Sequence, residues 1–74
     1  MLILILFLRI LACKTNGGNE VNKPCVFPFI YKSVDYYGCT KVDSDKYWCY
    51  TEVDSNGYGV LGKWGYCNAN CNGK

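Results

Sequence analysis

The chain has 74 residues, with six cysteines, eight basic and six acidic residues, and no histidine. This length allows one small domain, and a formal charge of +2 without any basic run argues against nucleic acid or an anionic membrane surface as a partner. Without histidine the usual nucleophile–base pairs cannot form, so we expect no enzyme and no cofactor.

The first twelve residues are almost wholly apolar and are interrupted by Arg9. A run this short cannot cross a bilayer, which needs about 20 residues. It predicts a signal peptide over residues 1–12, cleaved after Ala12, and therefore a secreted, extracellular protein with no transmembrane segment. Two alternatives stay open: a gene model truncated at its start, and a lipoprotein-like cleavage site before Cys13.

The six cysteines in so short a chain indicate a disulfide framework, because a small domain buries too little surface to be stable on its core alone. A zinc site normally uses closely spaced cysteine or histidine pairs. Only Cys67 and Cys71 lie close together here. The sequence therefore predicts disulfides and no metal, although six cysteines allow fifteen pairings.

Residues 13–24 form a polar lead-in with Gly17 and Gly18, which we interpret as an irregular N-terminal strap. The segment 25–39 is aromatic and β-prone, but Pro28 bars a regular central strand. Residues 32–35 are expected to turn into Tyr36 and Tyr37, of which one faces inward and one outward.

A loop is expected at Asp43–Asp45, then a strand over 47–53 and a turn at Asp54–Gly57, where Asn-Gly favours positive φ. A returning strand would begin near Tyr58. The acidic residues read as turn residues, because the ligand spacing of a calcium loop is absent. Residues 68–74 form a C-terminal tail. With no helical period after residue 12, the fold class is small, disulfide-rich and β.

The spacing of the cysteines and aromatic residues over 25–67 resembles the fibronectin type II module, a kringle-like domain. Its pattern appears as Cys25 with Pro28-Phe29 and Tyr31, then Cys39, then Trp48-Cys49, and finally the closing segment 64–67, Trp-Gly-Tyr-Cys. A longer loop at 54–57 departs from the family pattern.

The resemblance implies two short, perpendicular antiparallel sheets around an aromatic cluster. It also implies the pairs Cys25–Cys49 and Cys39–Cys67, which would leave Cys13 to pair with Cys71 and tie the two ends together. The fold, the pairing and the site below are expectations that follow from the family.

Modules of this family bind collagen or gelatin, or the phosphorylcholine head groups of membrane lipids. The resemblance implies an aromatic cage for the ligand, at Tyr31, Trp48, Tyr58 and Trp64. Faces of Trp and Tyr attract a quaternary ammonium through their quadrupoles. A small domain also needs aromatic residues for its core, and we expect Phe27, Phe29 and Tyr66 there, while the two tryptophans can serve both purposes.

We therefore expect a secreted ligand-binding module whose partner is a collagen-like or gelatin-like protein or a choline phospholipid head group. Two alternatives remain. The first is a disulfide-rich toxin, antimicrobial or inhibitor that uses the same scaffold, which the near-neutral charge disfavours. The second is one module of a larger extracellular receptor or protease.

Overall fold

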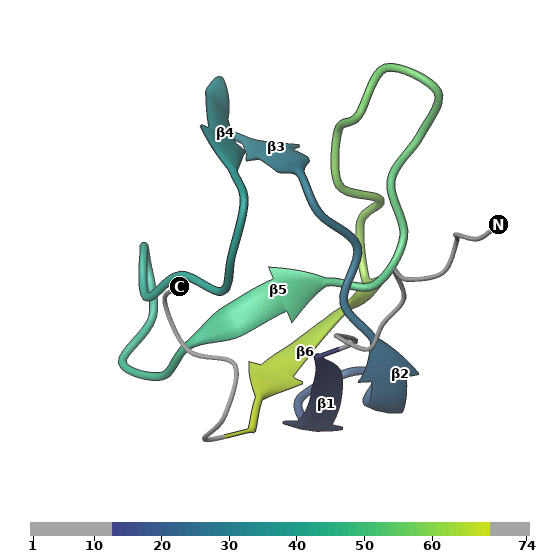
Figure 1. Cartoon of the computed structure of the whole chain (residues 1–74). Coiled ribbons are helices and arrows are strands. Elements are labelled where there is room, and N and C mark those ends of the chain that lie inside the picture. Colours follow the sequence, from purple (N-terminus) through teal and green to yellow (C-terminus); the bar gives the residue numbers. More distant parts are fainter. Residues whose placement is uncertain (1–12, 69–74) are drawn as a thin grey trace, which may run out of the picture.

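The computed structural model describes residues 13–68, so the predicted signal peptide and Cys71 of the predicted tail lie outside the described residues. Within this range the chain forms six short strands in two antiparallel sheets (Figure 1). The strands are β1 (Lys14–Gly17), β2 (Val21–Pro24), β3 (Phe29–Tyr31), β4 (Val34–Tyr36), β5 (Trp48–Tyr50) and β6 (Trp64–Cys67). This confirms an all-β module with two antiparallel sheets.

The larger sheet has the strand order β2-β1-β6-β5. Its first two strands occupy the segment that we expected to be an irregular strap, and that expectation was wrong. The backbone of β1 pairs with β6, where Thr15 lies opposite Cys67, and the buried Thr15 hydroxyl accepts a hydrogen bond from the Lys23 amide at 3.1 Å. The polar segment is ordered because β6 offers it a free edge of hydrogen-bonding groups.

The smaller sheet is the β3–β4 hairpin, which in Figure 1 lies apart from the larger sheet, above β5. Its two turn residues are Lys32 and Ser33, and both have positive φ, at 49° and 69°. Two consecutive positive φ values match a type I′ turn, whose twist suits a two-residue hairpin. The turn expected over 32–35 is therefore present but shorter, because residues 34 and 35 already belong to β4. Pro28 lies just before β3, outside the strands.

The turn at 54–57 is also present, because the Gly57 amide donates to the Asp54 carbonyl at 2.9 Å and Gly57 has φ 92°. The returning segment expected from near Tyr58 does pair with the segment before the turn, but the pairing is interrupted. Val53 bridges Gly59, the Val60 amide donates to the Glu52 carbonyl at 3.0 Å, and regular pairing resumes only where β6 pairs with β5. The loop is held from outside, since the Ile30 amide donates to the Gly57 carbonyl at 2.9 Å.

The core is built around Phe29, which is fully buried. Its ring lies 5.4 Å from the rings of Tyr36 and Trp48 and 5.3 Å from that of Tyr50. Tyr37, next to Tyr36, is 72% exposed, so one of the two tyrosines faces inward and the other outward, as the sequence predicted.

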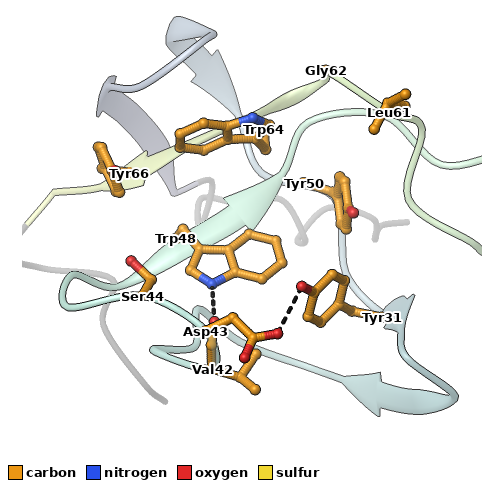
Figure 2. A pocket seen from close by; sticks show the side chains of 10 residues that line it. All are labelled: Tyr31, Val42, Asp43, Ser44, Trp48, Tyr50, Leu61, Gly62, Trp64 and Tyr66. Carbon is orange, nitrogen blue, oxygen red and sulfur yellow. Dashed lines mark hydrogen bonds between the residues drawn. The ribbon is translucent and has the colours of Figure 1, made fainter.

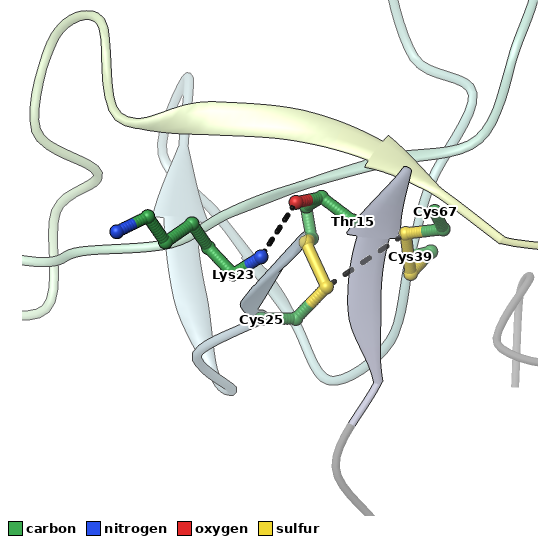
Figure 3. The surroundings of a disulfide bond; sticks show 6 residues. Thr15, Lys23, Cys25, Cys39 and Cys67 are labelled. Carbon is green, nitrogen blue, oxygen red and sulfur yellow. Dashed lines mark hydrogen bonds between the residues drawn. A yellow bond between two sulfur atoms is a disulfide. The ribbon is translucent and has the colours of Figure 1, made fainter. Parts of the chain in front are cut away.

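Two disulfides join the sheets and loops, Cys25–Cys49 and Cys39–Cys67, as the resemblance implied. Figure 3 shows them side by side, with the Sγ atoms of Cys25 and Cys67 in contact at 3.9 Å. Cys13 is also disulfide-bonded. Its expected partner, Cys71, lies outside the described residues, so that pairing stays a prediction.

Candidate functional site

The site begins with the alternation of side chains along β5 and β6. Residues two apart on a strand share a face, and directly opposite residues on paired strands share it too. Trp48 lies opposite Tyr66 and Tyr50 lies opposite Trp64, so four aromatic rings stand on one face of this strand pair. On the other face Cys49 lies opposite Gly65, and both are buried.

These rings line a pocket of about 320 Å³, a volume within the range of small-ligand sites (Figure 2). The rings touch along each strand, with centroids 5.2 Å apart for Trp48 and Tyr50 and 5.1 Å apart for Trp64 and Tyr66. The full lining is Tyr31, Val42, Asp43, Ser44, Trp48, Tyr50, Leu61, Gly62, Trp64 and Tyr66.

A fifth ring, that of Tyr31, comes from the other sheet. It meets Trp48 edge-on at 5.1 Å and lies 6.2 Å from Tyr50. A tight turn follows Tyr31 and leads into β4, so Tyr31 lies at the turn end of the hairpin. Its ring packs against the two aromatic residues of β5. The pocket therefore depends on the packing of the two sheets.

The loop between Thr40 and Lys46 forms a further wall of the pocket. Thr40 bridges Trp48, and the Trp48 indole Nε1 donates to the Val42 carbonyl at 2.9 Å. This bond satisfies the polar edge of a buried tryptophan and fixes its orientation. The backbone then bends at Asp43, which has φ 57°, a conformation that aspartate tolerates better than most residues.

The bend places the carboxylate of Asp43 beside the rings, as Figure 2 shows. Its Oδ2 accepts a hydrogen bond from the Tyr31 hydroxyl at 2.8 Å. The same oxygen forms an ion pair with Lys32 Nζ at 2.9 Å. The Lys32 hydrogen bond, with help from Tyr31, holds the pKa of Asp43 below its ordinary value. The bond to Asp43 in turn raises the pKa of Tyr31 and that of Lys32.

Three of the four predicted cage residues, Tyr31, Trp48 and Trp64, line this pocket, and Tyr58 does not. Tyr58 is bridged to Ile30, and bridged residues place their side chains on the same face. Ile30 and Tyr31 are neighbours in β3 and face opposite ways. Tyr58, which is 50% exposed, is thus directed away from the pocket that Tyr31 lines.

The pocket also contains residues that the sequence did not single out for it. Tyr50 and Tyr66 follow the two tryptophans at a spacing of two, so strand alternation was an available signal. We expected Tyr66 in the core; it is half-buried, packs against the core and also lines the pocket. Asp43 and the 95% exposed Leu61 sit in loops, where no periodicity predicts their neighbours.

Four cysteine sulfurs, those of Cys25, Cys39, Cys49 and Cys67, lie within 4.8 Å of one another. They do so because the two disulfides pack together. A sulfur in a disulfide has no thiolate to offer a metal ion, so this cluster is structural.

The fold and the site together define a small, disulfide-bonded β module with a preformed aromatic pocket. The family model of the fibronectin type II domain matches residues 25–67, more than half of the chain. The chain therefore belongs to the fibronectin type II domain family.

The similar proteins include a collagenase and proteins of seminal plasma and sperm binding. The chain is 40% identical over 58 residues to the 72 kDa type IV collagenase of Gallus gallus, covering 76% of this chain and 8% of that protein. It is 44% identical over 61 residues to seminal plasma protein HSP-1 of Equus caballus, covering 82% and 47%, respectively. It is 40% identical over 45 residues to binder of sperm protein homolog 2 of Mus musculus, covering 61% and 30%. No solved structure matches the chain.

The chain thus spans less than half the length of these relatives. It holds one fibronectin type II module over residues 25–67, the module that it shares with the seminal plasma and sperm-binder relatives. Within residues 13–68 there is no helix with the length and apolar character needed to cross a membrane.

Proposed function

We propose that this protein is a secreted binding module that holds the choline head group of a phospholipid in the pocket between β5, β6 and Tyr31. The observation that carries the proposal is the pocket itself, where five aromatic rings surround a space of about 320 Å³ beside a carboxylate. A quaternary ammonium cannot donate a conventional hydrogen bond, so aromatic faces and a nearby negative charge are its natural partners.

Membership of the fibronectin type II family supports the proposal. Domains of this family bind collagen or gelatin and phosphorylcholine, and the horse relative is a seminal plasma protein. Three disulfide-bonded pairs of cysteines would suit an extracellular setting, in agreement with a cleaved signal peptide over residues 1–12.

A collagen-like or gelatin-like chain is the second candidate. It is favoured by the identity to a type IV collagenase and by Leu61, an exposed apolar side chain at the edge of the pocket. An extended peptide could lay its apolar side chains over Leu61 and the rings, with no need for a cation.

Retention of the refolded protein on phosphorylcholine resin and on gelatin resin tests both candidates. We expect retention on phosphorylcholine resin and elution by free choline. Retention on gelatin alone would replace the first candidate by the second, and retention on neither would overturn the proposed function.

Substitution of Trp64 by alanine tests whether the pocket is the site. Loss of this ring should weaken phosphorylcholine binding about tenfold, because each cation–π contact contributes roughly 0.5–2 kcal/mol. The matched control is Tyr37→Ala, which removes an exposed ring that does not line the pocket. Equal affinities for the two variants, both folded by near-ultraviolet circular dichroism, would place the ligand elsewhere.

A further inference from the structure

One feature of the pocket distinguishes it from a purely aromatic cage. A charged pair stands at its side, made of Asp43, which lines the pocket, and Lys32, which does not. The side chains of Lys32 and Asp43 are 68% and 49% exposed, so both charges are open to a ligand. We call these two residues the charged pair.

Only one of the two carboxylate oxygens of Asp43 makes polar contacts with other side chains of residues 13–68. Both contacts, to the Tyr31 hydroxyl and to Lys32 Nζ, fall on Oδ2. No hydrogen bond within the described part of the chain reaches Oδ1. Tyr31 is committed as a donor to Asp43 and is therefore not free to donate to a ligand phosphate unless that bond is broken. The ammonium of Lys32, 5.6 Å from the centroid of the Tyr31 ring, is a cation on the Asp43 side of the pocket that can meet a phosphate. A second ammonium, that of Lys46, lies 5.1 Å from the centroid of the Tyr66 ring.

We propose that the charged pair selects a zwitterionic ligand, with Asp43 facing the ligand's quaternary ammonium beside the rings and Lys32 facing its phosphate. This inference rests on the proposed function and names two specificity-determining residues for it. An exposed ion pair is weak on its own, so a ligand that brings an opposite charge to each partner can exchange places with it at little cost. A ligand with a cation alone meets a carboxylate whose charge Lys32 already compensates.

The two substitutions are expected to change the affinity for tetramethylammonium in opposite directions, while both weaken the binding of phosphorylcholine. Affinities for phosphorylcholine and for tetramethylammonium are measured at low ionic strength by calorimetry, with wild type, Asp43→Asn and Lys32→Gln. Asp43→Asn should weaken both ligands about threefold to tenfold. Lys32→Gln should weaken phosphorylcholine by a similar factor and strengthen tetramethylammonium, because the carboxylate loses its compensating charge.

Matched variants separate the site from overall charge. Asp45→Asn and Lys14→Gln make the same changes in net charge at exposed positions outside this pocket, and both should bind like the wild type. Asparagine also tolerates the positive φ at position 43, so Asp43→Asn should keep the loop.

Any of four outcomes would overturn the inference. Unchanged tetramethylammonium affinity in Asp43→Asn would remove the carboxylate from recognition. Parallel losses for both ligands in Lys32→Gln would show that lysine acts only by holding the loop. Wild type that binds neither ligand would overturn the proposed function and this inference with it, whereas binding that no charged-pair variant alters would overturn the inference alone.

Discussion

At the scale of single residues, Asp43 shows how much one backbone conformation can decide. As a loop residue in a short polar stretch it reads as an ordinary turn former, and it does occupy a turn, since the Ser44 amide donates to the Lys41 carbonyl at 3.0 Å. Its positive φ turns the carboxylate toward Tyr31 and Lys32. The same residue therefore shapes the loop and supplies charge to the pocket.

The lowered pKa of Asp43 predicts a pH dependence of stability. Its pKa lies below the ordinary value of 3.8, so the folded state holds fewer protons here than the unfolded chain. The stabilisation is fully present above that ordinary value and is lost as pH falls through the lowered pKa. We expect the free energy of unfolding to drop as pH falls below this ordinary value, and to drop less in Asp43→Asn.

Urea unfolding followed by tryptophan fluorescence at a series of pH values measures this drop. Asp45→Asn is the control, because among residues 13–68 its carboxylate takes part in no ion pair. Identical acid profiles for wild type and Asp43→Asn would show that the bonds to Lys32 and Tyr31 do not persist in solution.

At the scale of elements, the β1–β2 hairpin is the part that local pattern did not reveal. It has no apolar alternation, and β2 is exposed along its whole length. It is held through β1, which pairs with β6, and through Thr15, whose side chain is only 3% exposed. An element of this kind takes its stability from backbone bonds to a neighbour and not from burial of its own face.

Thr15→Val tests that account. Valine keeps the shape and the burial but removes the acceptor for the Lys23 amide, so we expect a loss of about 1 kcal/mol in the free energy of unfolding. Amide hydrogen exchange should show faster exchange at Lys23, while amides of the β3–β4 hairpin exchange as in the wild type. Unchanged protection of Lys23 would mean that the hydroxyl does not hold the hairpin.

At the scale of the whole molecule, the disulfides and one central ring take the place of a large core. Within the described range the buried apolar residues are Phe29, Cys39, Trp48 and Cys49, and two of these four are themselves disulfide cysteines. A core this small cannot stabilise the chain by itself. The bridges close loops with sequence separations of 24 and 28 residues.

Removal of one bridge should therefore unfold the module. The double variant Cys39→Ala and Cys67→Ala loses about 3–4 kcal/mol by the loop-entropy estimate, an amount comparable with the stability of a small domain. Near-ultraviolet circular dichroism should lose its aromatic signal, and phosphorylcholine binding should vanish. A variant that keeps both would show that the aromatic cluster is sufficient to hold the fold.

The predicted Cys13–Cys71 bridge calls for a separate measurement. Proteolysis without reductant followed by mass spectrometry should yield a peptide containing Cys13 joined to one containing Cys71. Any alkylated cysteine in the unreduced protein would contradict a three-bridge framework.

The sequence, read with its family resemblance, predicted the class of fold, a turn within 32–35, the turn at Asp54–Gly57, and three of the residues that line the pocket, Tyr31, Trp48 and Trp64. These features follow from turn chemistry and from the spacing of cysteines and aromatic residues, which act over short stretches or reappear throughout the family. Only the tertiary structure decided that a polar segment becomes two strands, that Tyr58 faces away from the pocket and that Asp43 faces into it. Each of these depends on contacts between segments far apart in the chain, and such contacts leave no periodic mark in either segment.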